Sequence, residues 1–177
     1  MFKKSQIWIE TVIYTMIGLA IISILLSIGM PQIEKIKDRS IVKQSIDSLN
    51  LLDSKISEIS EEPEGSIRIV FLGLSKGRIE INSKDNKITY VLENTRLELS
   101  EPDEKIKEGK LIIETKKYGE RFNIFLTLDY NKTIDLSFEE NEINKTLQSG
   151  PNPYKIKIEN LGYNIDEKKI RVNLNTL

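Results

Sequence analysis

The sequence predicts an α+β protein, with one long N-terminal helix followed by an antiparallel, β-sandwich-like domain. Residues 7–30 form an almost unbroken apolar run, and apolar residues then recur at spacings of three and four as far as residue 62. From residue 66 onward, apolar and polar residues instead tend to alternate in short segments that are separated by turn residues. The change of period at residues 62–66 therefore divides a helical part from a β-rich part.

The apolar run, assigned to residues 6–30, is long enough to cross a membrane. At about 1.5 Å per residue its helix spans about 35 Å, and a bilayer core is about 30 Å thick. The one charge inside the run is Glu10, and the lysines Lys3 and Lys4 precede it. Short positive flanks tend to stay in the cytoplasm. We therefore predict a single-pass protein in contact with membrane lipid, with a cytoplasmic N-terminus and an extracellular C-terminal domain.

The basic residues that follow the run oppose this orientation. Lys35, Lys37, Arg39 and Lys43 outnumber the lysines before the run, although Glu34 and Asp38 interrupt them. By the count of basic residues alone, the C-terminal flank is the more positive one.

Residues 31–62 are predicted to continue as an amphipathic helix. Pro31 is expected to end or kink the first helix, but helical spacing resumes directly after it. Glu62-Pro63-Glu64-Gly65 is a clear breaker at the far end. We expect the C-terminal half of the apolar stripe to pack on the strands of its own domain, and the N-terminal half to face sister helices. The stripe consists of Ile33, Ile36, Val42, Ile46, Leu49, Leu52, Ile56 and Ile59.

Residues 66–177 are predicted to form the β-rich extracytoplasmic domain. Short strands at intervals of roughly ten residues, with turns between them, are typical of an antiparallel sandwich or rolled sheet. Ser100–Gly109 is predicted to be a polar loop, and Glu139–Ser149 fits either a short helix or a loop. The predicted strands cover residues 67–72, 79–81, 88–92, 97–99, 111–115, 122–128, 134–138, 154–158 and 170–174.

The composition argues against several classes of function. The 26 basic and 27 acidic side chains give a formal net charge of -1 and are mostly interleaved, which argues against nucleic-acid binding. Histidine and cysteine are both absent from the sequence. Their absence excludes thiolate nucleophiles, Ser-His triads, disulfides and nearly all zinc or haem ligation. We therefore predict a protein that is not an enzyme and holds no cofactor.

Two acidic groups, residues 61–64 and 135–142, raise the question of a metal site. Neither has the alternating oxygen ligands around a central glycine that a calcium loop requires. We interpret both groups as solvated surface.

The junction before the apolar run carries the most specific pattern, Lys3-Lys4-Ser5-Gln6. It resembles the class III signal peptide of type IV pilin precursors, in particular the archaeal pilin and archaellin type. That family is cut after a small residue ahead of the apolar stretch, typically in the pattern basic-basic-Gly-Gln, and Ser5 here replaces the glycine. Cleavage before Gln6 would place Glu10 at the fifth mature position, where many pilins carry glutamate.

The resemblance implies a structural subunit of a type IV-type surface filament. Residues 1–5 would be a cleaved leader, and residues 6–30 would wait in the membrane before entering the filament core. Glu10 would pair with the α-amino group of Gln6 in a neighbouring subunit. The implied partners are a prepilin peptidase, an assembly ATPase platform, and identical or related pilin subunits.

A different class of protein fits the same topology. An uncleaved, single-pass membrane-anchored binding module with a β-sandwich domain would need neither cleavage at Ser5 nor the carboxylate of Glu10. The two readings differ in the N-terminus of the native protein.

Two segments fit the Asn-x-Ser/Thr rule for N-glycosylation, Asn131-Lys132-Thr133 and Asn144-Lys145-Thr146. Both lie in predicted turns or loops, so Asn131 and Asn144 are candidate acceptors in a surface protein. The alternative is chance, because a chain rich in asparagine is expected to contain about two such matches.

Overall fold

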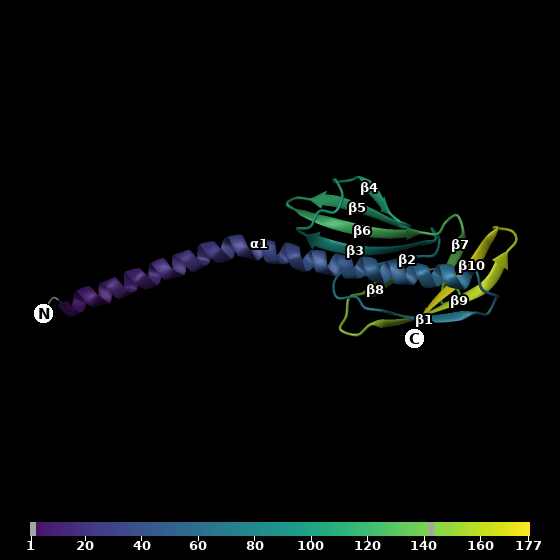
Figure 1. Ribbon diagram of the computed structural model, residues 1–177, viewed down its shortest axis with the longest axis horizontal. Coiled ribbons are helices and arrows are strands. Elements are labelled where there is room, and N and C mark those ends of the chain that lie inside the picture. The colour runs from purple at the N-terminus through teal and green to yellow at the C-terminus, as the bar shows by residue number, and fades with distance from the viewer. Residues whose placement is uncertain (1–2, 142–143) are drawn as a thin grey trace. The chain divides into compact units, whose positions relative to one another are not determined.

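The computed structural model describes residues 3–141 and 144–177, with side chains from Trp8 onward (Figure 1). The described chain contains one helix and ten strands, so the α+β class predicted from the sequence is confirmed. The chain divides into two compact units, the N-terminal unit Met1–Lys37 and the C-terminal unit Asp38–Leu177.

Helix α1 runs from Lys3 to Ser60 without interruption. Pro31 lies inside this helix. The proline therefore does not end the helix, which was one of the two outcomes expected for it. The helix ends just before the predicted breaker, because Pro63 lacks an N–H and Gly65 adopts a positive φ of 86°.

A buried asparagine closes the C-terminal end of α1. The Nδ2 atom of Asn160 donates to the carbonyls of Ile59 and Glu62, at 2.9 Å each. Its Oδ1 atom accepts from the N–H of Gly162 at 2.7 Å. The last carbonyls of a helix have no partner within the helix, and here strand β9 supplies one.

The C-terminal unit contains two sheets. One has four strands in the order β1-β9-β10-β7, and the other has six in the order β4-β5-β6-β3-β2-β8. The bounds are β1 Ile67–Leu72, β2 Arg78–Asn82, β3 Lys87–Thr95, β4 Lys105–Glu108, β5 Leu111–Tyr118, β6 Arg121–Asp129, β7 Ile134–Phe138, β8 Asn144–Gln148, β9 Tyr154–Asn164 and β10 Lys169–Thr176.

The expectation of a purely antiparallel arrangement is wrong for one pair of strands. Strand β7 runs parallel to β10, whereas every other described pair is antiparallel. A parallel pair needs a long connection, and the chain between β7 and β10 is long enough to include β8 and β9.

The C-terminal part of α1 packs on the strands of its own unit. Both sheets lie beside this part of the helix (Figure 1) and contribute to one core. The apolar stripe predicted from the sequence supplies the buried face of the helix, while Ile33 and Ile36 remain exposed. The helical core residues are Val42, Leu49, Leu52, Ile56 and Ile59.

Three strand predictions differ from the structure. Strands β4 and β8 lie in segments predicted to be a loop and a helix or loop, because each is an edge strand with little or no buried face and therefore lacks the alternating apolar pattern. Leu97 is buried but lies outside any strand. The left-handed φ of 56° at Asn94 and a bulge in the β3–β6 register precede it.

Candidate functional site

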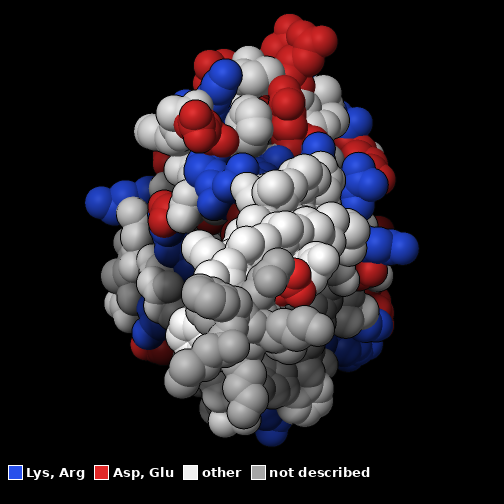
Figure 2. Space-filling view, turned by 90° about the vertical axis from the view of Figure 1, so that its left-hand side faces the viewer, with Lys and Arg blue, Asp and Glu red and all other residues white. Residues whose placement is uncertain are grey.

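The first candidate site is the apolar surface of α1 in the N-terminal unit. Every large apolar side chain from Trp8 to Met30 is exposed, including Trp8 at 74% and Ile28 at 68%. Figure 2 shows, next to the grey atoms, a white surface with an acidic residue on it, whereas charges of both signs are mixed over the rest of the coloured surface. A helix that is apolar all round suits a lipid or helix environment rather than water.

The hydroxyl groups of this helix suit such an environment as well. Thr15 Oγ1 donates to the carbonyl of Thr11, and Ser23 Oγ donates to the carbonyl of Leu19, at 2.8 Å each. Hydroxyls bonded within the helix need no water. An 18-residue window has a mean hydropathy of 2.3, so by length and composition this one helix among the described residues could span a membrane.

Glu10 is exposed on this apolar surface. Among the described residues it has no hydrogen-bond or ion-pair partner. The backbone of Lys3, Lys4, Ser5 and Gln6 lies in the first turns of α1, but their side chains lie outside the described part of the structure. The cleavage motif and the pairing of Glu10 therefore stay predictions.

Asp38 forms a buried polar anchor that the sequence pattern did not predict. Its side chain is 6% exposed, accepts from Lys76 Nζ at 2.7 Å and accepts from Thr95 Oγ1 at 2.5 Å. Burial disfavours the charged form, but these two hydrogen bonds and the charge of Lys76 outweigh it and lower the pKa of Asp38. The sequence does contain an indication that Asp38 is buried. Asp38 lies four residues before Val42 and therefore on the same face of the helix as the apolar stripe.

The lowered pKa of Asp38 predicts a stability difference that depends on pH. A carboxyl titrates near pH 3.9 in the unfolded chain, so the contribution of Asp38 is fully present above that pH and is lost as pH falls through the lower folded pKa. Replacing Asp38 with Asn should lower the free energy of unfolding by about 2 kcal/mol at pH 7. This is less than the cost of breaking a fully buried ion pair, because the Lys76 side chain is half-exposed. Urea unfolding of both proteins at pH 7 and at pH 2.5 tests this. An equal difference at the two pH values would contradict it.

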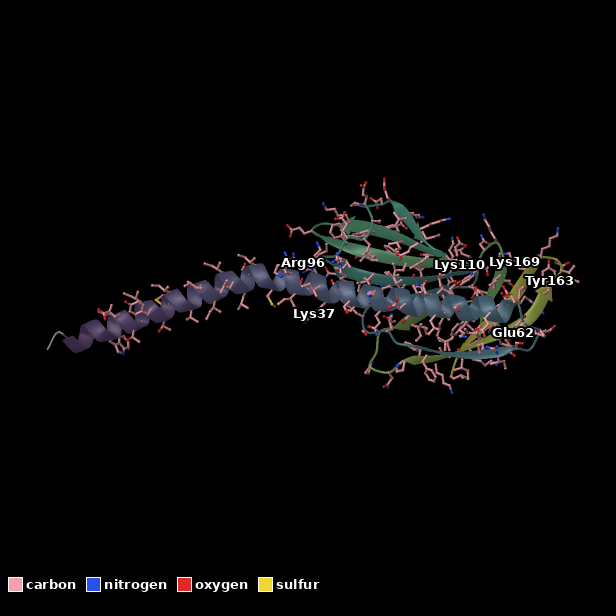
Figure 3. The ribbon with its side chains drawn as sticks, in the orientation of Figure 1. Lys37, Glu62, Arg96, Lys110, Tyr163 and Lys169 are labelled. Atoms are coloured by element: carbon pink, nitrogen blue, oxygen red, sulfur yellow. The ribbon has the colours of Figure 1, made fainter. Side chains whose placement is uncertain are left out.

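A second polar anchor joins α1 to the six-stranded sheet. Tyr130 donates its hydroxyl hydrogen to Asp53 Oδ1 at 2.9 Å, and burial together with the charge of Asp53 raises the pKa of Tyr130. Lys110 Nζ donates to Ser57 Oγ at 2.7 Å and lies 3.4 Å from Asp53 (Figure 3).

This anchor borders a groove of the C-terminal unit with a volume of about 630 Å³. Its lining mixes Lys107, Lys110 and Lys132 with Glu61 and Asp129. Among the described residues, no group of three or more acidic side chains is placed to hold a metal ion. The groove is therefore a surface of mixed charge.

Both predicted glycosylation acceptors are exposed. Asn131 lies in the turn between β6 and β7, where its N–H donates to Asp129 Oδ1 at 3.0 Å, and it also lines the groove. Asn144 lies on the edge strand β8 opposite Asn82 rather than in a loop. Both side chains are therefore accessible for modification.

Comparison with protein-family models, with curated protein sequences and with solved structures finds no match to this chain.

Proposed function

We propose that this protein is a pilin-like structural subunit of a type IV-type surface filament. The observation that carries the proposal is the apolar surface of α1, which is exposed from Trp8 to Met30 and is interrupted by the single charge of Glu10. Burying an apolar side chain contributes about 1.5–3 kcal/mol, so a surface of this size requires cover. Lipid would cover it before assembly, and sister helices would cover it in the filament.

The proposal includes processing and topology. A prepilin peptidase would cut between Ser5 and Gln6, with the N-terminus in the cytoplasm and the C-terminal unit outside the cell. An assembly ATPase platform would then move the subunit into a filament of identical or related subunits. The two sheets that share the C-terminal part of α1 would form a sandwich-like head on the filament surface.

Glu10 has a specific role in this proposal. A carboxylate in the bilayer centre costs about 2.5–3.5 kcal/mol on insertion scales and less near an interface. Its exposure on the apolar helix leaves it available to another chain. The α-amino group of Gln6 in a neighbouring subunit, freed by cleavage, would offset that cost and set the register of one helix against the next.

Replacing Glu10 with Gln tests this role. Loss of a pairing worth about 1.4 kcal/mol or more lowers an equilibrium constant about tenfold or more. Filaments counted by electron microscopy should therefore fall at least about tenfold, while processed subunit accumulates in the membrane. The control is Glu61→Gln, which changes an exposed carboxylate of the C-terminal unit and should leave filament number unchanged. Normal filaments from the Glu10→Gln variant would contradict the role.

The second candidate is an uncleaved, membrane-anchored binding module. The groove beside Lys110, with its mixed lining, is the observation that favours it. In this case Met1–Ser5 would remain on the mature protein, and Glu10 would be a carboxylate near the cytoplasmic interface. Neither candidate assigns a catalytic activity to the chain.

A further inference from the structure

Strand β1 exposes a row of large apolar side chains. Ile67 is 44% exposed, Ile69 is 48% exposed and Phe71 is 63% exposed. The alternate residues Val70 and Leu72 are buried in the core, so both faces of this strand are apolar. Charged residues make up 30% of the chain. Three apolar side chains in a row on one exposed face of a strand therefore stand out from the rest of the surface.

Strand β1 is also an open edge. It is the first strand of the four-stranded sheet and pairs on one side with β9. The N–H of Asn160 donates to the carbonyl of Ser66 at 3.0 Å, so the backbone groups of Ser66 point toward β9. In an antiparallel ladder, every second residue turns its N–H and C=O to the same side. The backbone groups of Ile67, Ile69 and Phe71 therefore point away from β9, and Arg68 Nη1 donates to the Ile67 carbonyl at 3.0 Å.

The other described edges are closed or polar. Along β7, the N–H groups of Ile134, Leu136 and Phe138 donate to Tyr130 O, Asn86 Oδ1 and Asn141 O. Strand β4 carries two lysines, and β8 carries exposed Asn, Thr and Gln side chains. Charged and polar side chains protect sheet edges from pairing. In β1 the one charged residue, Arg68, is held by Glu58 and Glu62 and covers the edge only at the Ile67 carbonyl. The edge at Ile69 and Phe71 carries no charged or polar side chain of the strand.

We propose that β1 pairs with β1 of a second copy of this chain. The pairing would be antiparallel and centred on Ile69, so that Ile69 lies opposite Ile69 and Ile67 lies opposite Phe71 of the other copy. It would join the two four-stranded sheets into one continuous sheet.

The sequence of β1 makes this pairing complementary to itself. The centred register sets apolar side chains against apolar ones, and it sets Arg68 opposite Val70, so no like charges face each other. A lipid surface is the less suitable occupant. It could cover the apolar side chains, but it would leave the edge N–H and C=O groups without hydrogen-bond partners. Another strand satisfies both requirements.

The contact goes beyond the proposed function. A two-fold contact is closed at two copies, so it cannot extend a filament in one direction. It would instead link two filaments side by side, or two unassembled subunits.

Cysteine crosslinking of the full chain tests the register, because the natural sequence has no cysteine. Residues opposite each other in an antiparallel pair have Cα atoms about 5.5 Å or less apart, which is within the range of a disulfide. The variant Ile69→Cys should form a disulfide-linked dimer under mild oxidation. Ile67→Cys alone should crosslink weakly, but should crosslink to Phe71→Cys when the two variants are mixed. Ile165→Cys, at an 81% exposed position away from β1, is the matched control.

A second variant separates this proposal from the proposed function. Ile69→Lys places two lysines at the centre of the contact and should abolish dimers measured by light scattering in detergent, with N-terminal processing and filament number unchanged. Equal crosslinking at Ile69 and Ile165, or no crosslinking at Ile69, would overturn the pairing. Loss of filaments from Ile69→Lys would also overturn it, because β1 would then belong to the contact that extends the filament.

Discussion

Replacing Ile56 with Ala is expected to lower the free energy of unfolding of the C-terminal unit by about 3–4 kcal/mol. Ile56 is fully buried on the inner face of α1, within the core that the two sheets share. Truncating a buried isoleucine removes its transfer free energy and leaves a cavity, which together cost about 2–5 kcal/mol. Urea unfolding of the full chain in mild detergent, followed by circular dichroism, measures the change.

Leu51 provides the matched control for this prediction. It lies on the same helix, only five residues away, but is 48% exposed. Leu51→Ala should cost less than about 1 kcal/mol, because surface substitutions away from special features have small effects. Equal losses at Ile56 and Leu51 would mean that this face of α1 is not the buried one.

Replacing Gly77 with Ala is expected to cost about 3 kcal/mol or more. Gly77 has a φ of 82°, which is unfavourable for a residue with a Cβ atom, and an added Cβ would lie 2.4 Å from the carbonyl oxygen of Val91. The oxygen belongs to the backbone of β3, so it cannot move without disturbing the β2–β3 ladder. The free energy of unfolding, measured as above, reports the loss.

A substitution at Gly109 distinguishes the cost of the positive φ from the cost of the close contact with Val91. Gly109 also has a positive φ, 62°, but an added Cβ would meet nothing within 4 Å. Gly109→Ala should therefore cost only the backbone term of about 1–2 kcal/mol. If both variants lose the same free energy, close contact with Val91 is not what requires glycine at position 77.

The helix and most strands could be predicted because their buried faces leave a period in the sequence. The stripe that includes Leu49 and Ile56 predicts a helix, and β7 has the bounds predicted from Ile134 to Phe138. Strands β4 and β8 could not be predicted in this way, because burial imposes no alternation on exposed edges. The parallel pairing of β7 with β10 is a property of topology, on which local pattern gives no information.

The candidate sites were predicted unevenly for similar reasons. The apolar surface around Glu10 follows from hydropathy alone, whereas the anchor at Asp38 depends on Lys76 and Thr95, which are far away in the sequence. The open edge at β1 likewise depends on contacts between residues that are far apart in the sequence. Residues 67–72 are apolar on both faces in the sequence, but only the strand order places them at the edge of a sheet.

The N-terminus of the native protein distinguishes a pilin-like filament subunit from an anchored binding module. Intact mass measurement and N-terminal sequencing should be made on protein purified from membranes or filaments of a host that has a prepilin peptidase. For a pilin-like subunit we expect a chain that begins at Gln6, with Met1–Ser5 removed and Glu10 at the fifth position. A mature chain that retains Met1–Ser5 would contradict the filament proposal and favour the anchored binding module.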